Sequence, residues 1–112
     1  MKIGVSSQNF RTITGHAGKA RRFFVFKQQG DEIIELDRID LPKEMSMHEY
    51  HGNNHPVYKL DILITAGCGR GFVNRMASHD VQVIATADTD PKVAVENLLA
   101  GKSLTPPAPH EH

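Results

Sequence analysis

The sequence predicts a mixed α/β domain in which helices pack on a sheet of about five strands. Three observations predict this class. The second half of the chain alternates strand-like and helix-like segments, which requires parallel strands joined by right-handed crossovers. The first half has short strand-like runs separated by turns, which favours antiparallel pairing. The chain has 112 residues, close to the commonest size of one domain and enough for a core without disulfides.

The chain opens with a strand, a loop and a second strand. Residues 3–5 form a short apolar run that ends at two serines. Residues 8–20 (QNFRTITGHAGKA) have no steady period and carry two glycines, which indicates a loop. Residues 21–29 (RRFFVFKQQ) are rich in residues that favour strands and lead into a turn at Gly30.

The next apolar residues change sides of their strand. In residues 32–41 (EIIELDRIDL), Leu36 and Ile39 fall on opposite parities. Side chains alternate along a strand, so a β-bulge near residues 37–38 is needed to bring both to one face. Residues 42–58 then form a long polar loop, a length that is typical of functional loops or of disorder.

The second half begins with a strand, a glycine turn and a helix. Residues 61–67 (DILITAG) are continuously apolar between polar flanks, as in a strand covered on both faces. A turn at Gly67–Gly71 (GCGRG) leads into a helix. The apolar face of this helix is expected to consist of Phe72, Val73, Met76 and Ala77.

A further strand and helix complete the domain. Residues 81–87 (VQVIATA) predict the strand. Asp90 is a suitable N-cap with Pro91 at the first helical position, and Gly101 is a natural stop. We therefore expect a domain over residues 1–101 and a disordered tail over residues 102–112 (KSLTPPAPHEH).

The composition excludes several classes of protein. The 13 Lys and Arg residues balance 13 Asp and Glu, so no overall charge indicates a nucleic-acid or membrane partner. The apolar runs are much shorter than the ~20 residues of a membrane helix, and the N-terminus does not resemble a signal peptide. The single cysteine, Cys68, excludes an internal disulfide and fits a reducing compartment. The sequence predicts a cytoplasmic, soluble protein and indicates no oligomeric state.

The predicted sheet suggests where a ligand would bind. Ligands of such sheets collect beyond the carboxyl ends of the parallel strands. Three segments should meet there: the loop over residues 6–20, the glycine turn and the turn over residues 86–91. Backbone N–H groups of the glycine turn could hold an anion at the start of the helix. The alternative is that these glycines only permit a tight turn.

His16 and Cys68 are the most suggestive single residues. His16 lies between glycines and is followed by Lys19, Arg21 and Arg22, which suit a negatively charged partner. It could also be an ordinary solvated histidine among surface charges. Cys68 could be a thiolate of lowered pKa at a helix N-terminus, or a small packed residue.

The polar loop carries a cluster of histidines. His48, His51 and His55 lie within the stretch MHEYHGNNHP. The order His-Glu-Tyr-His is one residue too short for the zinc-protease motif, and Gly52 and Pro56 prevent a long helix. These imidazoles could bind a divalent metal ion or contribute to a cofactor site, or they could be solvated.

In several blocks the chain resembles the dinitrogenase iron–molybdenum cofactor biosynthesis family, the small domain of NifX- and NafY-type carriers and of the NifB C-terminus. The matching blocks are KIGVSS, GHAGKARRFFVF, DILITAGCGRGFVNRM, VQVIATA and DPKVAVENLLAG, which span the chain up to residue 101. The second block matches the family's His-Phe-Gly-x-Ala…Phe pattern through His16, Gly18, Ala20 and Phe23. Ala17 departs from the usual phenylalanine.

The resemblance implies a ribonuclease H-like, three-layer α/β/α domain that binds an iron–sulfur cofactor or an iron–molybdenum cofactor precursor. It implies a role in nitrogen fixation or related cofactor biosynthesis, with cofactor-assembly or acceptor proteins as partners. It also gives His16 the role of a cofactor ligand. Together with the loop and turn positions above, the expected cofactor-binding residues are His16, Gly18, Lys19, Arg21, Gly67, Cys68, Gly69 and Arg70, and the expected metal ligands are His16, His48, His51 and His55.

The favoured function is therefore a non-catalytic carrier or assembly protein. A small divalent-metal module built on the three loop histidines is the alternative. A ribonuclease H-like nuclease is disfavoured, because two-metal chemistry needs clustered carboxylates and the first strand (MKIGVSS) has none.

Overall fold

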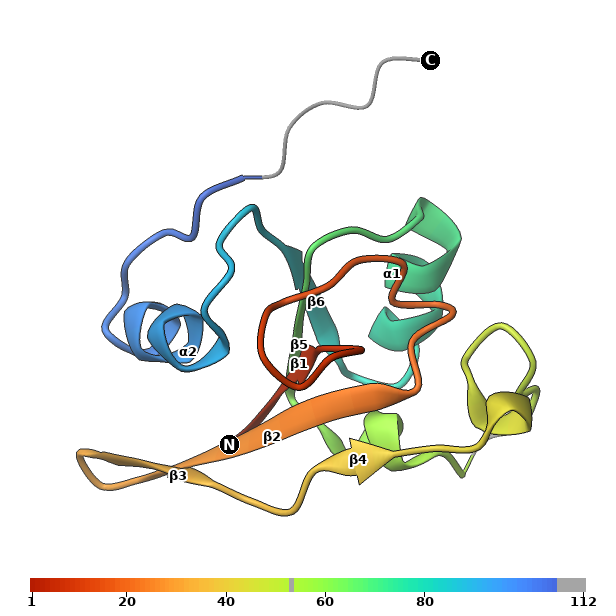
Figure 1. Ribbon diagram of the computed structural model, residues 1–112, viewed down its shortest axis with the longest axis horizontal. Coiled ribbons are helices and arrows are strands. Elements are labelled where there is room, and N and C mark those ends of the chain that lie inside the picture. The colour runs from red at the N-terminus through yellow and green to blue at the C-terminus, as the bar shows by residue number, and fades with distance from the viewer. Residues whose placement is uncertain (53, 107–112) are drawn as a thin grey trace.

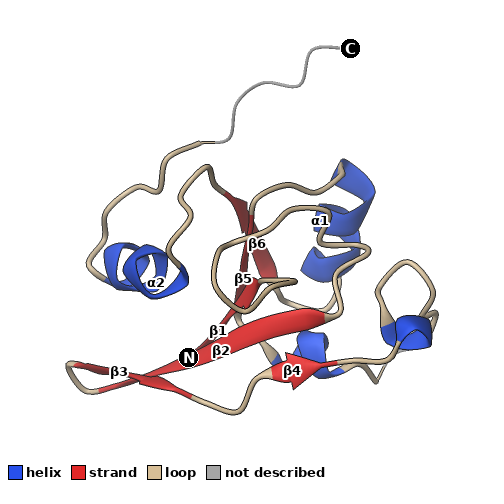
Figure 2. Ribbon diagram, viewed as in Figure 1, coloured by secondary structure: helices blue, strands red, loops and turns tan. Residues whose placement is uncertain are grey.

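The structure is a computed structural model that describes residues 1–52 and 54–106. In these residues six strands form one mixed sheet that carries two α-helices (Figures 1 and 2). The strands are β1 (Lys2–Ser6), β2 (Arg22–Gln29), β3 (Glu32–Glu35), β4 (Ile39–Asp40), β5 (Ile62–Thr65) and β6 (Gln82–Ala85). The helices are α1 (Arg70–Ala77) and α2 (Pro91–Leu99), and the polar loop contains two short 3-10 helices, Lys43–Met45 and Pro56–Lys59.

The strand order confirms the predicted mixed sheet. The order is β3-β2-β1-β5-β6, with β4 also paired to β2. The pairs β1–β5 and β5–β6 are parallel, whereas β2 is antiparallel to each of its neighbours. The expectation of about five strands falls one short, because residues 32–41 form two short strands where one was expected.

The β-bulge between these two strands is confirmed by the register. Phe26 pairs with Glu35, but Phe23 pairs with Ile39. Three residues, 36–38, therefore lie opposite the two residues 24–25. The extra residue turns Leu36 and Ile39 to the same side, where both pack against one core cluster.

A core cluster lies on each face of the sheet. Met76 of α1 belongs to the cluster that contains Phe23 and Leu63, and Val95 of α2 belongs to the cluster that contains Ile64. β5 contributes to both clusters, as predicted for a strand covered on both faces. Figure 2 shows α2 and α1 on opposite sides of the strands, so the domain has three layers. The ribonuclease H-like assignment stays a prediction.

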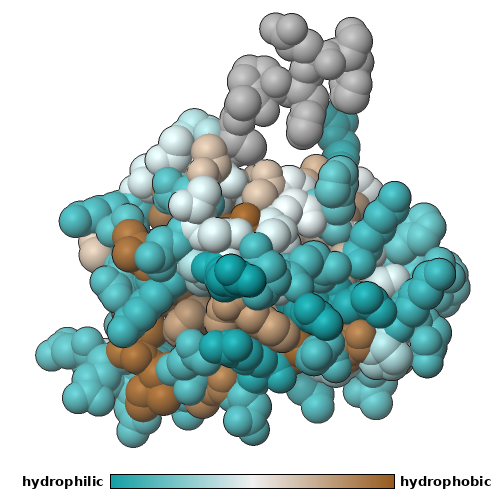
Figure 3. Space-filling model, viewed as in Figure 1, coloured by the Kyte–Doolittle hydropathy of each residue, from teal (hydrophilic) through white to brown (hydrophobic). Residues whose placement is uncertain are grey.

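One residue differs from the predicted apolar face of α1, and the surface carries one apolar region. Ala77 was expected on the apolar face of α1 but is exposed at the last helical residue. On the view in Figure 3 most of the surface is hydrophilic, and apolar residues gather at the lower left, where Figure 1 places β3. Ile33 and Ile34 of this edge strand are only half-buried.

The ends of α2 are as predicted, but the chain beyond it is not free of the domain. The Asp90 carboxylate accepts a hydrogen bond from the Val93 N–H at 3.1 Å, and Gly101 follows the helix with φ +79°. The Thr105 carbonyl accepts hydrogen bonds from Ala87 N–H at 2.8 Å and Thr86 Oγ1 at 2.7 Å. The first residues of the predicted tail are thus docked on the loop between β6 and α2, and residues 107–112 lie outside the described residues.

No helix in residues 1–52 and 54–106 is long and apolar enough to cross a membrane.

Candidate functional site

A cleft of about 690 Å³ opens where β5 runs into α1. This volume lies in the range that proteins use for cofactors and small molecules. Four segments line it: the β1–β2 loop, the part of the polar loop that carries Met47 and His48 (the segment around His48), the β5–α1 turn and α1 itself. The lining residues are Gly15, His16, Gly18, Lys19, Met47, His48, Ala66, Gly67, Cys68, Gly69, Gly71, Phe72 and Arg75.

Hydrogen bonds fix the β1–β2 loop against the glycine turn. Ala17 N–H donates to the Gly67 carbonyl at 3.1 Å, and Ala66 N–H donates to the Thr14 carbonyl at 3.0 Å. Ser6 Oγ also donates to the Thr14 carbonyl, at 2.6 Å. The predicted approach of the two segments is therefore present in the structure (Figure 1).

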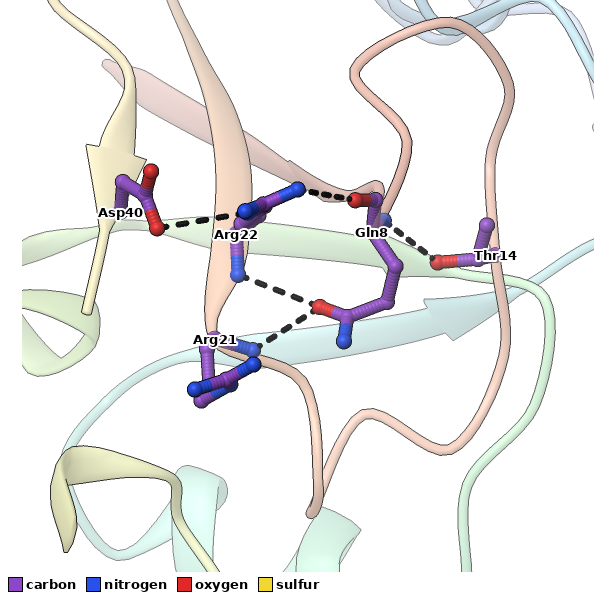
Figure 4. A network of polar contacts seen from close by, with 5 residues as sticks. All are labelled: Gln8, Thr14, Arg21, Arg22 and Asp40. Carbon is purple, nitrogen blue, oxygen red and sulfur yellow. Dashed lines mark hydrogen bonds and ion pairs between the residues drawn. The ribbon is translucent and has the colours of Figure 1, made fainter. Parts of the chain in front are cut away.

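A polar network closes the base of the same loop (Figure 4). Gln8 Oε1 accepts the backbone N–H groups of Arg21 at 3.0 Å and Arg22 at 3.3 Å. The Arg22 guanidinium donates to the Gln8 carbonyl at 3.0 Å and pairs with Asp40 at 3.3 Å. Arg22, one of the cations expected near a ligand, therefore serves the loop and the β2–β4 pair.

His16 stands at an unusual backbone position in this loop. Its φ is +56°, in the left-handed region, and its side chain is exposed on the cleft. Such a conformation costs free energy for a residue other than glycine and is concentrated at functional sites. The next residue, Ala17, is completely buried, which holds the backbone in place.

The backbone conformation of the β5–α1 turn does not require its three glycines. None of Gly67, Gly69 and Gly71 has a positive φ, and a Cβ added at any of them would meet no atom within 4 Å. The turn therefore does not require these glycines. Their effect is to leave this part of the cleft wall, at the start of α1, without side chains.

Cys68 lies in the cleft wall, but its electrostatic environment differs from the prediction. The thiol is half-buried, and burial raises its pKa above the ordinary value. Of the two alternatives for Cys68, this direction does not fit the thiolate of lowered pKa and agrees with a packed thiol.

Several predicted residues lie outside the cleft. Arg70 is exposed and does not line it, and Arg21 lines a smaller neighbouring depression together with Lys19, Lys43 and His48. The turn over residues 86–91 contacts the β1–β2 loop through Ile13 N–H and the Thr89 carbonyl at 2.9 Å, but it contributes nothing to the cleft lining. Two of the three segments expected to meet therefore line the cleft, and the third contacts the β1–β2 loop outside it.

The three loop histidines have three different environments. His48 lines the cleft, and His51 is exposed outside it. His55 is buried: its Nε2 donates to the Met45 carbonyl at 2.6 Å, and its Nδ1 accepts the Val57 N–H at 3.1 Å. Both ring nitrogens are engaged, so this arrangement does not offer His55 as a metal ligand and corrects the expected three-histidine site.

Arg75 is a cleft residue that the sequence did not single out. Its guanidinium donates to the carbonyls of Met47 and Tyr50 and to the Tyr58 hydroxyl, the last at 3.0 Å. The signal in the sequence is a cation three residues after Phe72, on the edge of the apolar face of α1. Its role depends on the polar loop folding back over the helix, which no periodicity reveals.

Comparisons with known proteins identify the family. A family model described as dinitrogenase iron-molybdenum cofactor matches residues 1–101. The crystal structure of a protein designated PH0822 superposes with a TM-score of 0.71 at 15% identity, over 93% of this chain and 96% of that one. The solution structure of a putative NifB protein from Thermotoga superposes with a TM-score of 0.63 at 12% identity, over 99% and 97% of the two chains.

At these identities the two structures show a shared fold. No functionally curated protein matches the sequence. The family model, however, covers nearly the whole chain and the same blocks that line the cleft. The chain therefore belongs to the dinitrogenase iron-molybdenum cofactor family.

Proposed function

We propose that this protein is a non-catalytic carrier or assembly factor that binds an iron–sulfur-type metallocofactor or its precursor in the cleft. Family membership supports a role in cofactor handling. The observation that carries the proposal is the placement of His16, His48 and Cys68, from three separate segments, around one cleft. A ligand that fills the cleft meets side chains from all three segments.

The chemistry of the cleft suits such a cargo. Imidazole and thiolate are iron ligands, and iron–sulfur clusters are commonly anionic. Lys19, Arg75 and the N-terminus of α1 supply positive potential without permanent metal bonds. We assign His16 the role of anchoring ligand. A carrier must release its cargo, and few protein ligands favour release.

Two other functions receive less support. No group of three or more His, Cys, Asp and Glu side chains in the described part of the chain is placed to share a metal ion, which disfavours a simple divalent-metal module. The cleft lining, as far as the structure describes it, contains no Asp or Glu. A two-metal nuclease would need such carboxylates.

The proposal is tested by titrating the apo-protein with an isolated iron–sulfur cofactor under anaerobic conditions, with Zn²⁺ in a parallel titration. We expect saturable uptake of one cofactor per chain, followed by absorbance and electron paramagnetic resonance, and weaker binding of Zn²⁺. Tight binding of Zn²⁺ with no uptake of the cofactor would reject the carrier function in favour of the metal module.

A substitution in the glycine turn separates binding from stability. Gly71→Ala should raise the free energy of unfolding by about 0.5–1 kcal/mol, because Gly71 lies in α1 with an ordinary φ and has room for a methyl group. The same methyl group should weaken cofactor binding, because it fills space on the cleft wall. Urea unfolding and cofactor titration measure the two effects. Stabilisation with unchanged affinity would show that the cargo does not approach this part of the turn.

A further inference from the structure

We propose that His48 is a second ligand of the cargo and that Arg75 is the residue that positions it. The inference rests on the carrier function proposed above and specifies how the cleft holds what it carries. It concerns the segment around His48, which lies within the residues that the family model matches but outside the sequence blocks quoted above for the resemblance.

The segment around His48 closes a ring of contacts about the cleft. The β1–β2 loop bonds to the glycine turn through Ala17 N–H and the Gly67 carbonyl, and to the His48 segment through His48 N–H and the Gly18 carbonyl at 2.6 Å. α1 follows directly from the glycine turn and returns to the His48 segment through Arg75. His48 is therefore fixed within the same ring as His16.

Arg75 holds the backbone on both sides of His48. Its two terminal nitrogens donate to the carbonyls of Met47, one residue before, and Tyr50, two residues after. Its Nε donates to the Tyr58 hydroxyl at 3.0 Å, and the Tyr58 ring stacks on His79 with centroids 3.6 Å apart. The guanidinium thus presets the backbone from which the His48 side chain extends, which lowers the entropic cost of ligation.

The His48 side chain itself is free to bind. Among the described residues neither of its ring nitrogens has a hydrogen-bond partner, in contrast to the two nitrogens of His55. His51 lies three residues further along the same segment but does not line the cleft. His48 and His51 are both exposed, and they differ in that only His48 lines the cleft.

Arg75 also contributes charge. It lines the cleft, and within the described residues no carboxylate pairs with it; the ion pairs seen there join Arg22 to Asp40 and Arg38 to Glu35. Carbonyl and hydroxyl partners leave the positive charge of the guanidinium uncompensated. An anionic cluster bound to His48 would be stabilised by it.

The test uses the full chain with four variants: His48→Ala, its matched control His51→Ala, Arg75→Lys and His16→Ala. Each is titrated with the isolated iron–sulfur cofactor, and the nitrogen couplings of the bound cluster are recorded by pulsed electron paramagnetic resonance with isotope-labelled histidine. We expect the wild type to show two coupled imidazoles. His48→Ala should lose one of them and weaken binding by about ten-fold or more, the order seen when a metal site loses such a contact. His51→Ala should leave both the couplings and the affinity unchanged.

Arg75→Lys distinguishes positioning from charge. Lysine keeps the charge but cannot donate to both carbonyls in the planar geometry of a guanidinium. We expect it to lose or alter the His48 coupling while the His16 coupling stays. A wild-type coupling pattern in both His48→Ala and Arg75→Lys, with unchanged affinity, would overturn the inference and leave the carrier function intact. Failure of the wild type itself to take up cofactor would instead reject the carrier function.

Discussion

Replacing His55 by alanine is expected to lower the free energy of unfolding by about 2–4 kcal/mol, because it empties a buried site and leaves polar groups without partners. The side chain is only 1% exposed. Its two nitrogens satisfy the Met45 carbonyl and the Val57 N–H, and Nδ1 caps the 3-10 helix that starts at Pro56. The measurement is urea unfolding followed by circular dichroism. His51→Ala, an exposed change in the same segment, should stay within about 0.5 kcal/mol of the wild type.

The same histidine should make stability depend on pH. Burial lowers the pKa of His55, the hydrogen bond to the Met45 carbonyl opposes this shift, and the nearby Arg75 charge adds to it. The unfolded chain therefore takes up this proton at a higher pH than the folded chain. The contribution of His55 to stability is complete above its ordinary pKa of about 6.5 and is lost as the pH falls toward the lowered value.

Unfolding free energies measured from about pH 7.5 to about pH 5.5 test this linkage. The wild type should lose stability over this interval, and His55→Ala should lose less of its remaining stability. Parallel curves for the two proteins would mean that His55 titrates alike in the folded and unfolded chains.

His55 also shows what the spacing of histidines could not predict. Three imidazoles in one polar loop indicate metal binding only if their side chains converge. Here the chain folds back so that His55 reaches the Met45 carbonyl ten residues earlier, with its ring packed near those of Tyr50 and Tyr58. The local signal was the following Pro56, a residue favoured at the start of a helical turn. Burial decides the role of this histidine, and burial depends on the whole fold.

Much of the fold follows from local rules in the sequence. The change of parity between Leu36 and Ile39 fixes the bulge, and Asp90 with Pro91 fixes the start of α2. The parallel order of β1 and β5 sends the loop of His16 and the glycine turn to the same end of the sheet. These features depend on alternation, capping and strand direction, which short stretches of sequence determine.

The rest of the cleft depends on long-range packing. Arg75 and Met47 line it because the polar loop is bonded to α1. The bonds run from Arg75 to backbone carbonyls, which every residue type possesses. The sequence therefore does not indicate which carbonyls accept these bonds. The docking of Thr105 on the β6–α2 loop is of the same kind, since it uses the Thr105 carbonyl.

Replacing His16 is expected to weaken cofactor binding by about ten-fold or more, the order seen when a metal centre loses a supporting contact. The variant should be His16→Asn as well as His16→Ala. Asparagine tolerates the left-handed conformation that His16 adopts at φ +56°. Alanine is strained in this conformation, which should lower the free energy of unfolding by about 1–2 kcal/mol. His16→Asn therefore removes the imidazole while keeping the loop, and its free energy of unfolding should match that of the wild type.

Anaerobic titration with the isolated iron–sulfur cofactor measures the loss, and His51→Ala is again the control for removal of an exposed imidazole outside the cleft. Loss of binding in both His16 variants, with only His16→Ala less stable, separates ligation from loop geometry. If His16→Asn and His16→Ala bind like the wild type while His48→Ala does not, the anchoring ligand lies in the segment around His48. The β1–β2 loop would then serve to shape the cleft, through Ala17 and its bond to the Gly67 carbonyl.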